Sequence, residues 1–322
     1  MPATTLSEWR EGPATRLVVR ALRLEARDVI SCELARPDRQ PLPAPEPGAH
    51  VDLHLPGGLV RQYSLVDWGE RHYTVAIQRE ANSRGGSRFL CDTLRVGDEL
   101  LVGAPRNAFA LDEGEHPSVL VAGGIGITPV LPMARRLAAL GRDWALYVAA
   151  RSEEQTPFVD ELRALGARVR FSFEQLVPGR FDLAEIVRRH GEHAHAYACG
   201  SARLLDGFLA ATAHLPPARV HIERFTAVQP EAGDGGIAVT LARSGRCVQV
   251  AADQTILDAL MAAGIAMPHS CQQGICGQCE VRVIAGEPEH RDSVLSEAER
   301  ASNQTMMVCC SRARSGALTL DL

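Results

Sequence analysis

Hydrophobic and polar side chains alternate along much of the first third of the chain. Residues 17–36 and 72–80 follow a period of two with many β-branched side chains, which predicts strands. Prolines and glycines in residues 41–66 break this pattern and then restart it. A short helix is predicted over residues 87–95. An antiparallel β-barrel explains this order better than a helical fold, so we expect residues 1–112 to form one.

The pattern changes in residues 113–225, where short continuous apolar runs alternate with stretches of helical spacing. The apolar runs, which predict strands buried on both faces, are residues 118–124, 144–150, 167–174 and 195–200. The helical stretches between them are residues 127–141, 157–165, 181–190 and 202–215. Strands that alternate with helices predict a doubly wound parallel α/β domain.

Residues 226–236 have the composition of a linker, and residues 237–322 predict a third, smaller domain. The pattern of this last part indicates a hairpin, an amphipathic helix, a cysteine-rich loop and a final strand at 317–322. A chain of 322 residues exceeds the usual size of one hydrophobic core, which agrees with several domains.

Composition excludes some classes of protein. The chain is 46% hydrophobic and 23% charged, the balance of an ordinary globular protein. The apolar runs are too short for a membrane span, and the first residues show no secretory signal. A net charge of −5 argues against nucleic acid as a partner, since nucleic-acid-binding domains have a basic face.

Four cysteines carry the most specific signal: Cys271, Cys276, Cys279 and Cys309 follow the spacing C-x4-C-x2-C-x29-C. This is the plant-type spacing of a [2Fe–2S] cluster, in which a distant fourth thiolate joins three on one loop. A zinc site is the alternative, but it usually has paired C-x2-C halves. Cys310 could compete as the fourth ligand, although the order C-x-S-R favours Cys309. An iron–sulfur site and free thiols indicate the reducing cytoplasm.

A second candidate site lies at the end of a predicted strand, at Arg61, Tyr63 and Ser64. The tyrosine ring could pack against the isoalloxazine face of a flavin, and Arg61 could hold phosphate. Ser64 could hydrogen-bond near the reactive flavin nitrogen. Alone, this pattern is also typical of an edge strand with a surface arginine.

The segment that follows strengthens the flavin interpretation. Gln78 leads into a glycine-bearing loop before the predicted helix, with Arg84, Gly85, Gly86 and Ser87 as candidate phosphate contacts. Glycines free backbone N–H groups, and a helix N-terminus attracts phosphate. Ser87 suits an N-cap or a phosphate donor. We therefore expect FMN, a flavin monophosphate, to bind here.

A third candidate site opens the helix after the first apolar run of the α/β domain, at Gly124, Ile125, Gly126 and Thr128. Glycines there would let the backbone approach a pyrophosphate, to which Thr128 could donate a hydrogen bond. A strand–glycine–helix turn can equally reflect tight packing alone.

Cys199 and Gly200 end the last clear strand of the α/β domain, and ligands of open parallel sheets bind beyond such ends. We expect both residues to lie at the binding site of a nicotinamide, with Cys199 positioning the ring. The alternative is that Cys199 is simply a buried core cysteine. Glu153 and Glu154 would repel a 2′-phosphate, which favours NADH over NADPH. Phe225 could shield the flavin ring or anchor the linker.

Six short motifs occur in one order: RQYSLV, REANSRGGS, GGIGITP, YACGS, ERF and, around the fourth cysteine, MVCCSRA. In this order, with the cysteines at the C-terminus, the chain resembles the phthalate dioxygenase reductase family of the ferredoxin–NADP⁺ reductase superfamily. The resemblance covers nearly the whole chain. Cys310 is a small departure, because an apolar residue is common at that position.

The resemblance implies an FMN-binding β-barrel, an NADH-binding α/β domain and a C-terminal β-grasp ferredoxin domain. It implies that NADH delivers hydride to FMN, and that single electrons then pass through the [2Fe–2S] cluster to a Rieske-type aromatic-ring oxygenase or O-demethylase. Ser64 and Cys199 are then the candidate catalytic residues, and we expect a monomer. The aromatic substrate is not indicated, because the oxygenase binds it.

Two other functions stay open. An electron-transfer subunit of another oxidoreductase complex, such as a dihydroorotate dehydrogenase partner, would typically carry FAD in place of FMN. A degenerate reductase with zinc at the cysteines would be a colourless scaffold.

Overall fold

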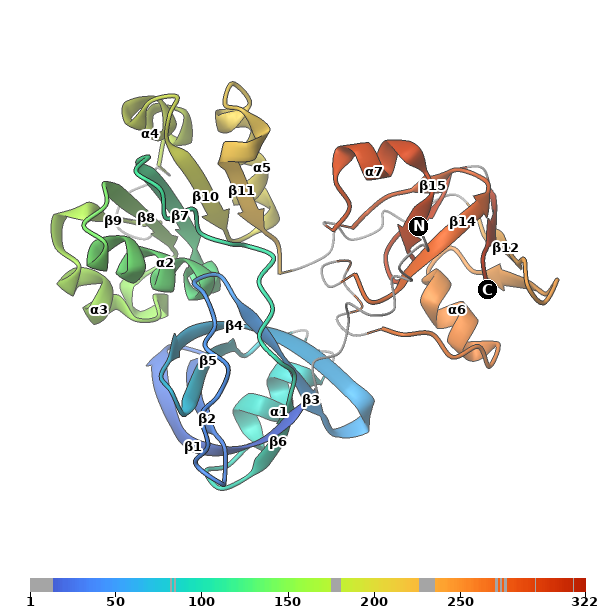
Figure 1. Cartoon of the computed structure of the whole chain (residues 1–322), viewed down its shortest axis with the longest axis horizontal. Coiled ribbons are helices and arrows are strands. Elements are labelled where there is room, and N and C mark those ends of the chain that lie inside the picture. Colours follow the sequence, from blue (N-terminus) through green and yellow to red (C-terminus); the bar gives the residue numbers. More distant parts are fainter. Residues whose placement is uncertain are drawn as a thin grey trace, which may run out of the picture. The chain divides into compact units, whose positions relative to one another are not determined.

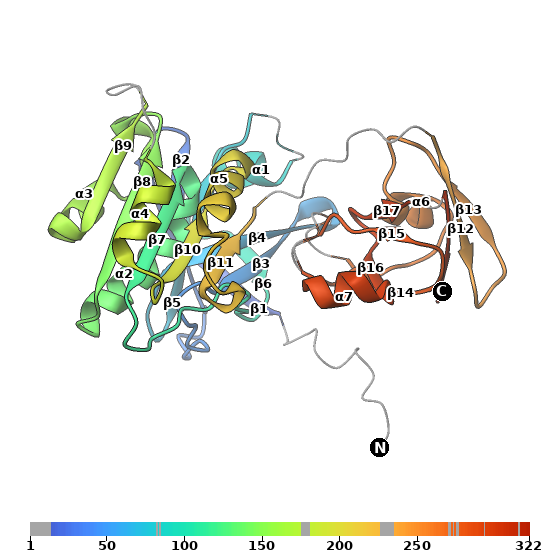
Figure 2. The ribbon, with the colours of Figure 1, turned by 90° about the horizontal axis from the view of Figure 1, so that it is seen from above.

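The structure is a computed structural model that describes residues 14–81, 83, 85–174, 181–225, 235–269, 272, 274, 277–292, 294–314 and 316–322 (Figures 1 and 2). The chain divides into two compact units, Met1–Glu223 and Arg224–Leu322, each with its own hydrophobic core. Within the described ranges, no helix combines the length and the apolar character that a membrane crossing requires.

The first unit begins with a closed antiparallel barrel, as the alternating pattern predicted. Its strands are β1 (Thr15–Ala26), β2 (Val29–Ala35), β3 (His50–Leu55), β4 (Leu59–Trp68), β5 (His72–Gln78) and β6 (Glu99–Val102). They close in the order β1-β2-β5-β4-β3-β6 around buried side chains such as Leu34, Leu53 and Val75. The helix α1 (Gly86–Asp92) packs beside β4 and β5 and is shorter than predicted. Strand β6 lies in a segment where the sequence indicated only a turn.

A five-stranded parallel sheet forms the rest of the first unit. Its strands are β7 (Ser118–Gly123), β8 (Trp144–Ala150), β9 (Val169–Phe173), β10 (His195–Cys199) and β11 (Val220–Glu223), in the order β11-β10-β7-β8-β9. The helices are α2 (Ile127–Ala139), α3 (Val159–Ala164), α4 (Leu183–His190) and α5 (Ala202–Thr212). This is the predicted doubly wound fold, to which the structure adds the short edge strand β11.

Helices cover both faces of this sheet. Val119 and Val121 of the central strand share a core with Ile186 of α4 and Phe208 of α5. The helix α2 packs against β7, β8 and β10. Since both faces are buried there, the inner strands β7 and β8 are almost entirely apolar and do not alternate as the barrel strands do. The edge strands β9 and β11 are less buried and include polar residues.

The second unit is the expected small ferredoxin-like domain. Its main sheet contains β12 (Ile237–Leu241), β13 (Cys247–Val250), β14 (Glu280–Ala285), β16 (Thr305–Met307) and β18 (Ala317–Leu320), in the order β13-β12-β18-β14-β16. A second pair joins β15 (Pro288–Glu289) to β17 (Arg312–Ala313), and the helices are α6 (Ile256–Ala262) and α7 (Glu297–Ser302). The strand pairs mix parallel and antiparallel registers, as a β-grasp fold requires.

Arg312 connects distant segments of the second unit. It is buried, and its guanidinium donates to the carbonyl oxygens of Ala251 at 3.2 Å, Ala252 at 3.1 Å and Gln254 at 2.8 Å. These carbonyls lie in the turn between β13 and α6. Buried carbonyls without donors are costly, so the arginine of the C-x-S-R order has a structural role.

Replacing Arg312 with methionine should destabilise the second unit by at least about 3 kcal/mol, because three carbonyl groups lose a charged donor. The thermal loss of visible iron–sulfur absorbance measures this effect. The matched control is Arg243→Met, since Arg243 pairs with Asp321 at the surface and should leave the unfolding temperature nearly unchanged. Equal losses in the two variants would contradict the structural role of Arg312.

Candidate functional site

The topology brings two of the predicted sites together. Strands β7 and β10 are neighbours at the centre of the parallel sheet, with Ala122 opposite Cys199 in register. The winding of the chain reverses between these strands, and such switch points bind ligands at the carboxyl ends of strands. The turn after β7, the 3₁₀ helix η3 (Gly124–Gly126), therefore lies beside the end of β10.

Glycines allow two backbone segments to touch at this point. A Cβ on Gly126 would lie 2.3 Å from the carbonyl oxygen of Cys199, and a Cβ on Gly200 would lie 3.1 Å from the Cα of Gly123. Gly124 differs, because it has a positive φ of 54° and nothing within 4 Å of its Cβ position. The glycine pattern thus has two causes: tight packing of the turn on β10, and an open backbone edge at Gly124.

Thr128 lies inside this turn. It is buried, and its hydroxyl donates to the carbonyl oxygen of Ile125 at 3.0 Å. Donation from Thr128 to a pyrophosphate, as the sequence predicted, would require this hydrogen bond to be exchanged. As the structure stands, Thr128 fixes the shape of the turn.

Cys199 and Glu223 are neighbours at the ends of β10 and β11. They are partners in the register of the two strands, and Cys199 is fully buried. Burial, and to a lesser extent the Glu223 carboxyl, raises the pKa of the Cys199 thiol well above its ordinary value. The thiol therefore stays protonated at neutral pH, which agrees with a positioning role and not with that of a nucleophile.

The sequence pattern alone gives Glu223 no role, whereas the structure places it in the site. Its Oε2 atom is buried and has no hydrogen-bond partner among the described residues. Burial raises the pKa of its carboxyl to about 8. Perturbed carboxyls of this kind cluster at functional sites. The signal that could have revealed it is an acidic residue at the end of the apolar run of β11.

The predicted flavin contacts Arg61, Tyr63 and Ser64 lie on β4. A Cβ on Gly86, at the start of α1, would lie 2.7 Å from the Cγ atom of Arg61. The strand and the loop that were predicted to share FMN are therefore in contact. Ser64 is buried, and its hydroxyl has no hydrogen-bond partner among the described residues, which fits a group that meets a ligand. Burial is the main cause that raises the pKa of Tyr63, so its phenol stays protonated.

The loop before α1 is closed by its own serines. The Oγ atom of Ser83 accepts hydrogen bonds from the backbone N–H groups of Gly85 at 3.2 Å and Arg88 at 3.3 Å. It also accepts one from the hydroxyl of Ser87 at 3.0 Å. The N-cap of α1 is Gly85, with a φ of 104°, so the prediction of Ser87 as N-cap was wrong. Serine is a good N-cap by propensity. Here, however, the helix begins at a position with a positive φ, which glycine adopts without strain.

Three further predicted flavin contacts have different outcomes. Gln78 ends β5, the barrel strand paired with β4. Arg84 lies outside the described residues. Phe225 belongs to the second unit, so its contact with the flavin stays a prediction.

Two of the four predicted cluster ligands lie within the described residues. Cys279 and Cys309 are both buried, and the N–H of Val308 donates to the carbonyl of Cys279 at 3.3 Å beside the paired strands β14 and β16. The N–H of Gly274 donates to the Sγ atom of Cys309 at 3.2 Å. Such donors stabilise negative charge on cluster sulfurs, so these residues fit a [2Fe–2S] site. The other two, Cys271 and Cys276, lie outside the described residues.

Cys310 has a different environment from Cys309. Its Sγ atom lies 2.5 Å from the position that a Cβ on Gly274 would take. It also lies 3.7 Å from the carbonyl oxygen of Met307 and 3.8 Å from the hydroxyl of Ser311, and its thiol interacts with that of Cys309. Since the N–H of Gly274 is directed at Cys309, the geometry favours Cys309 as the fourth ligand.

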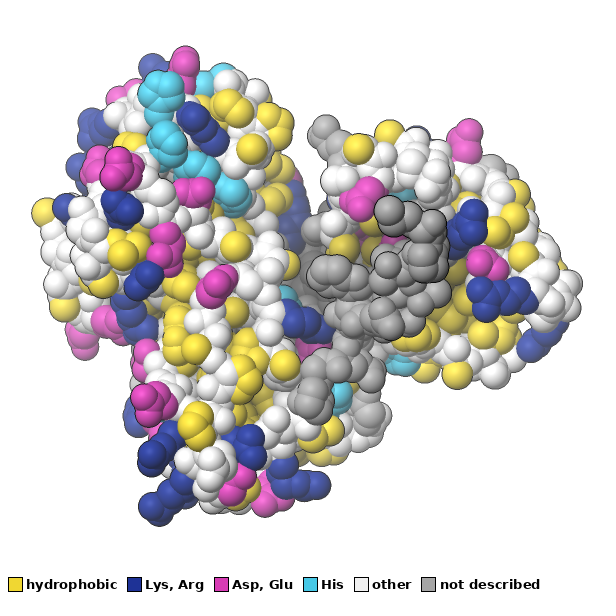
Figure 3. Space-filling model, viewed as in Figure 1, with side chains coloured by type: hydrophobic (Ala, Val, Ile, Leu, Met, Phe, Trp, Pro, Cys, Tyr) yellow, Lys and Arg dark blue, Asp and Glu magenta, His cyan; other side chains and the backbone are white. Residues whose placement is uncertain are grey.

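Histidine side chains gather on the α/β domain (Figure 3). The Nδ1 atom of His195 and the Nε2 atom of His221 are 3.2 Å apart, and both rings stack on Tyr197. In the part of the chain that the structure describes, no three His, Cys, Asp or Glu side chains are arranged to hold a metal ion. These histidines form an aromatic cluster of the fold, in keeping with the ordinary role that the sequence indicated.

Comparison with known proteins decides between the alternatives. The family model described as 2Fe-2S iron-sulfur cluster binding domain matches residues 239–314. Phenoxybenzoate dioxygenase subunit beta of Ectopseudomonas oleovorans is 49% identical over 95% of this chain and 97% of its own length. Phthalate dioxygenase reductase of Burkholderia cepacia is 40% identical over 97% of this chain and 99% of its own length. The chain belongs to the phthalate dioxygenase reductase family.

The solved structures agree with this membership. The structure of phthalate dioxygenase reductase matches with a TM-score of 0.77 and 38% identity, over 96% of this chain and 98% of that chain. That relative transfers electrons from pyridine nucleotides to a [2Fe–2S] centre. The chain is therefore a flavin and iron–sulfur oxidoreductase, the reductase component of an oxygenase system. The family model over residues 239–314 supports a [2Fe–2S] cluster over zinc.

We predict that Gly126→Ala destabilises the α/β domain by about 1 to 3 kcal/mol, because its Cβ would overlap the Cys199 carbonyl. Urea unfolding followed by tryptophan fluorescence measures this change, and the reduction of bound FMN by NADH should slow with it. Gly207→Ala in α5 is the control, since its Cβ would make only an ordinary contact, at 3.6 Å, with Leu183. Equal stability of the two variants would show that the close approach is not a real constraint.

We also predict that Glu223→Gln changes the pH dependence of stability. In the wild type the folded carboxyl, with a pKa of about 8, keeps a proton that the unfolded chain releases above 4.5. The stabilisation of the folded state by the protonated carboxyl is complete below pH 4.5 and is lost as the pH rises through 8. The variant lacks that loss, so its stability relative to the wild type should rise by about 2 kcal/mol between pH 6 and pH 8. Urea titrations at several pH values measure it, with the exposed Glu192→Gln as control; parallel curves would refute a raised pKa.

Proposed function

We propose that this chain is the NADH-dependent reductase of a Rieske-type oxygenase that acts on an aromatic compound, by ring oxygenation or O-demethylation. The observation that carries the proposal is full-length similarity to phenoxybenzoate dioxygenase subunit beta and vanillate O-demethylase oxidoreductase. One chain combines a doubly wound sheet, a flavin-type barrel and a [2Fe–2S] domain. When bound, FMN takes up hydride and gives up electrons singly, and the cluster carries them one at a time.

We propose that the nicotinamide cofactor contacts the switch point of the parallel sheet through Gly124, Ile125, Gly126, Thr128, Cys199 and Gly200. The open backbone edge at Gly124 supports a pyrophosphate position there. The protonated thiol of Cys199 provides a neutral surface for the nicotinamide ring. Glu223, beside it in the register, holds a proton at the same end of the sheet.

We propose that FMN contacts Arg61, Tyr63, Ser64, Gln78, Arg84, Gly85, Gly86, Ser87 and Phe225. The contact between Arg61 and Gly86 supports a shared phosphate position, because it places a guanidinium at the start of α1. The buried hydroxyl of Ser64 supports a role beside the reacting ring, since a buried polar atom without a partner is rare.

We propose Cys271, Cys276, Cys279 and Cys309 as the cluster ligands. The hydrogen bond from Gly274 to Cys309 supports this choice over Cys310. The domain division that we propose is 1–112 for FMN, 113–225 for NADH, a linker at 226–236, and 237–322 for the cluster. We expect a monomer that works in the cytoplasm, where reduced thiols persist.

Replacing Cys279 with serine should abolish NADH-dependent reduction of a one-electron protein acceptor such as cytochrome c, because the cluster loses a ligand. Reduction of the bound flavin by NADH should continue, since the barrel and the α/β domain are untouched. Anaerobic absorption spectra before and after NADH, together with the rate of cytochrome c reduction, measure both steps. Acid release and chromatography of the flavin check that it is FMN.

Cys310→Ala is the matched control for this experiment, because it removes a neighbouring buried thiol that is not among the proposed ligands. It should retain the cluster absorbance and most of the acceptor reduction. Normal acceptor reduction by Cys279→Ser would overturn the proposed order of electron transfer. Loss of the cluster in Cys310→Ala but not in Cys309→Ala would overturn the choice of Cys309.

A further inference from the structure

We propose that Arg135 is a positioning residue for hydride transfer. Its hydrogen bonds join helix α2, which begins after the turn Gly124–Gly126, to the barrel strand β4, on which the proposed flavin contacts lie. This inference rests on the proposed function. It comes from the first unit alone, where the barrel and the α/β domain share a contact between α2 and β4.

Two candidate sites lie on the two elements that Arg135 joins. The helix α2 (Ile127–Ala139) follows the turn Gly124–Gly126 directly, so any movement of the helix moves that turn. The strand β4 (Leu59–Trp68) carries Arg61 to Ser64. Pro132 interrupts the hydrogen bonds of α2 between the turn and Arg135, but the helix around it is buried and packed. Hydrogen bonds between Arg135 and β4 therefore still fix one candidate site against the other.

The barrel offers Arg135 an acceptor at a β-bulge. In the pairing of β4 with β5, Leu65 is opposite Val75 and Asp67 is opposite Thr74, which leaves Val66 as an extra residue. Bulges interrupt the hydrogen-bond ladder, and they are common next to active sites. Here the Nη1 atom of Arg135 donates to the carbonyl oxygen of Val66 at 2.6 Å. This acceptor lies only two residues beyond Ser64.

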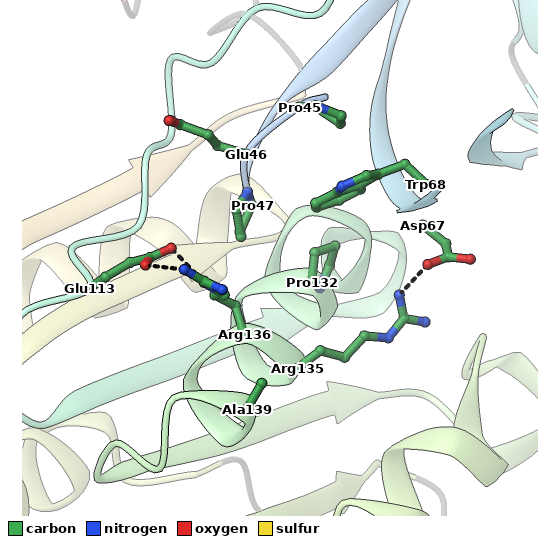
Figure 4. Close-up of a pocket in the computed structure, with 10 residues that line it drawn as sticks. All are labelled: Pro45, Glu46, Pro47, Asp67, Trp68, Glu113, Pro132, Arg135, Arg136 and Ala139. Atoms are coloured by element: carbon green, nitrogen blue, oxygen red, sulfur yellow. Dashed lines mark hydrogen bonds and ion pairs between the residues drawn. The ribbon is translucent and has the colours of Figure 1, made fainter. Parts of the chain in front are cut away.

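The same guanidinium is held from the other side by α3. Its Nε and Nη2 atoms donate to the two carboxylate oxygens of Glu161, the second at 2.7 Å. Nη1 also approaches the Oδ1 atom of Asp67 at 3.5 Å (Figure 4). The planar fork thus faces a carboxylate and a backbone carbonyl at once, which the single ammonium of lysine does not reproduce.

A surface groove of about 560 Å³ lies beside these hydrogen bonds, lined from the barrel by residues that include Pro45, Pro47 and Trp68, and from α2 by Pro132 and Arg136 (Figure 4). Most of α2 before Arg135 is buried, and the helix packs against β4. Packing therefore holds α2 on the barrel, and the hydrogen bonds of Arg135 fix the position of its second half, beside the open groove.

Hydride transfer is sensitive to such placement. The reacting atoms must come within about 3 to 3.5 Å, and a misplacement of about 1 Å can reduce the rate about 100-fold. Loss of the Arg135 hydrogen bonds should therefore slow the transfer step itself and leave the binding of FMN to the barrel unchanged. This pattern distinguishes positioning from a general structural role.

The test compares Arg135→Met with the wild type in single-turnover, anaerobic reduction of bound FMN by saturating NADH. We expect the limiting rate constant per bound FMN to fall at least about 10-fold. The charge-transfer absorbance between nicotinamide and flavin should weaken, and the isotope effect with C4-deuterated NADH should grow. Arg135→Lys should restore only part of the rate.

The matched control is Arg136→Met. Arg136 is the next residue of α2 and makes an equivalent paired contact with Glu113, at 2.8 and 2.7 Å, but it does not bind β4. It should stay within about twofold of the wild-type rate. Glu161→Gln keeps the hydrogen bond from Arg135 to Val66, so its limiting rate should fall less than that of Arg135→Met. If Arg135→Met fails to fold, the comparison of Arg135→Lys, Glu161→Gln and Arg136→Met provides the test.

An unchanged limiting rate in Arg135→Met or Arg135→Lys, with wild-type protein reduced normally, would overturn the inference alone. An equal loss in Arg136→Met or a full loss in Glu161→Gln would do the same, since either would indicate a general effect on the α/β domain. A wild-type protein whose bound flavin NADH does not reduce would overturn the proposed function, and the inference with it.

Discussion

The contact between the backbone after β7 and the end of β10 is the constraint on which the first unit depends. No side chain fits between them, since a Cβ on Gly126 would meet the Cys199 carbonyl at 2.3 Å. This contact places the start of α2 and the carboxyl ends of the two central strands in one position. At Gly124, by contrast, nothing lies within 4 Å of the Cβ position, which leaves an open backbone edge. A single steric limit therefore shapes both the packing of the sheet and the open edge where we propose that a pyrophosphate binds.

Helix α2 carries that constraint to the barrel. Its first residue follows the glycine turn, and Arg135, about two turns later, reaches the bulge at Val66. The bulge is a local irregularity of β4 that frees an acceptor in the direction of the helix. An ideal ladder at this point would leave Arg135 without that carbonyl. The bulge of β4 and the hydrogen bond from Arg135 thus together join the barrel to the α/β domain.

Periodicity predicted the barrel and the doubly wound sheet because their long strands and helices repeat a clear pattern. It missed β6 and β11, which have four residues each and are too short to establish a period. The spacing of cysteines predicted the cluster, and glycines marked the switch point. The raised pKa of Glu223 had no signal of comparable strength, since it depends on burial that only the tertiary structure creates. Arg135 resembles any arginine on the polar face of a helix until the bulge that it meets is known.

Cys199 and Cys309 show that the effect of burial on a thiol depends on the groups around its sulfur atom. Both thiols are buried, to 0% and 3% exposure. At Cys199 the nearest acidic group is itself protonated over much of the neutral range, and burial keeps the thiol neutral. At Cys309 a backbone N–H points at the sulfur, and a ligand to iron must be a thiolate. Hydrogen-bond donors suit a site where added electrons must be stabilised, which supports the proposed place of Cys309 at the cluster. The neutral thiol of Cys199 supports its proposed place as a contact surface and not as a nucleophile.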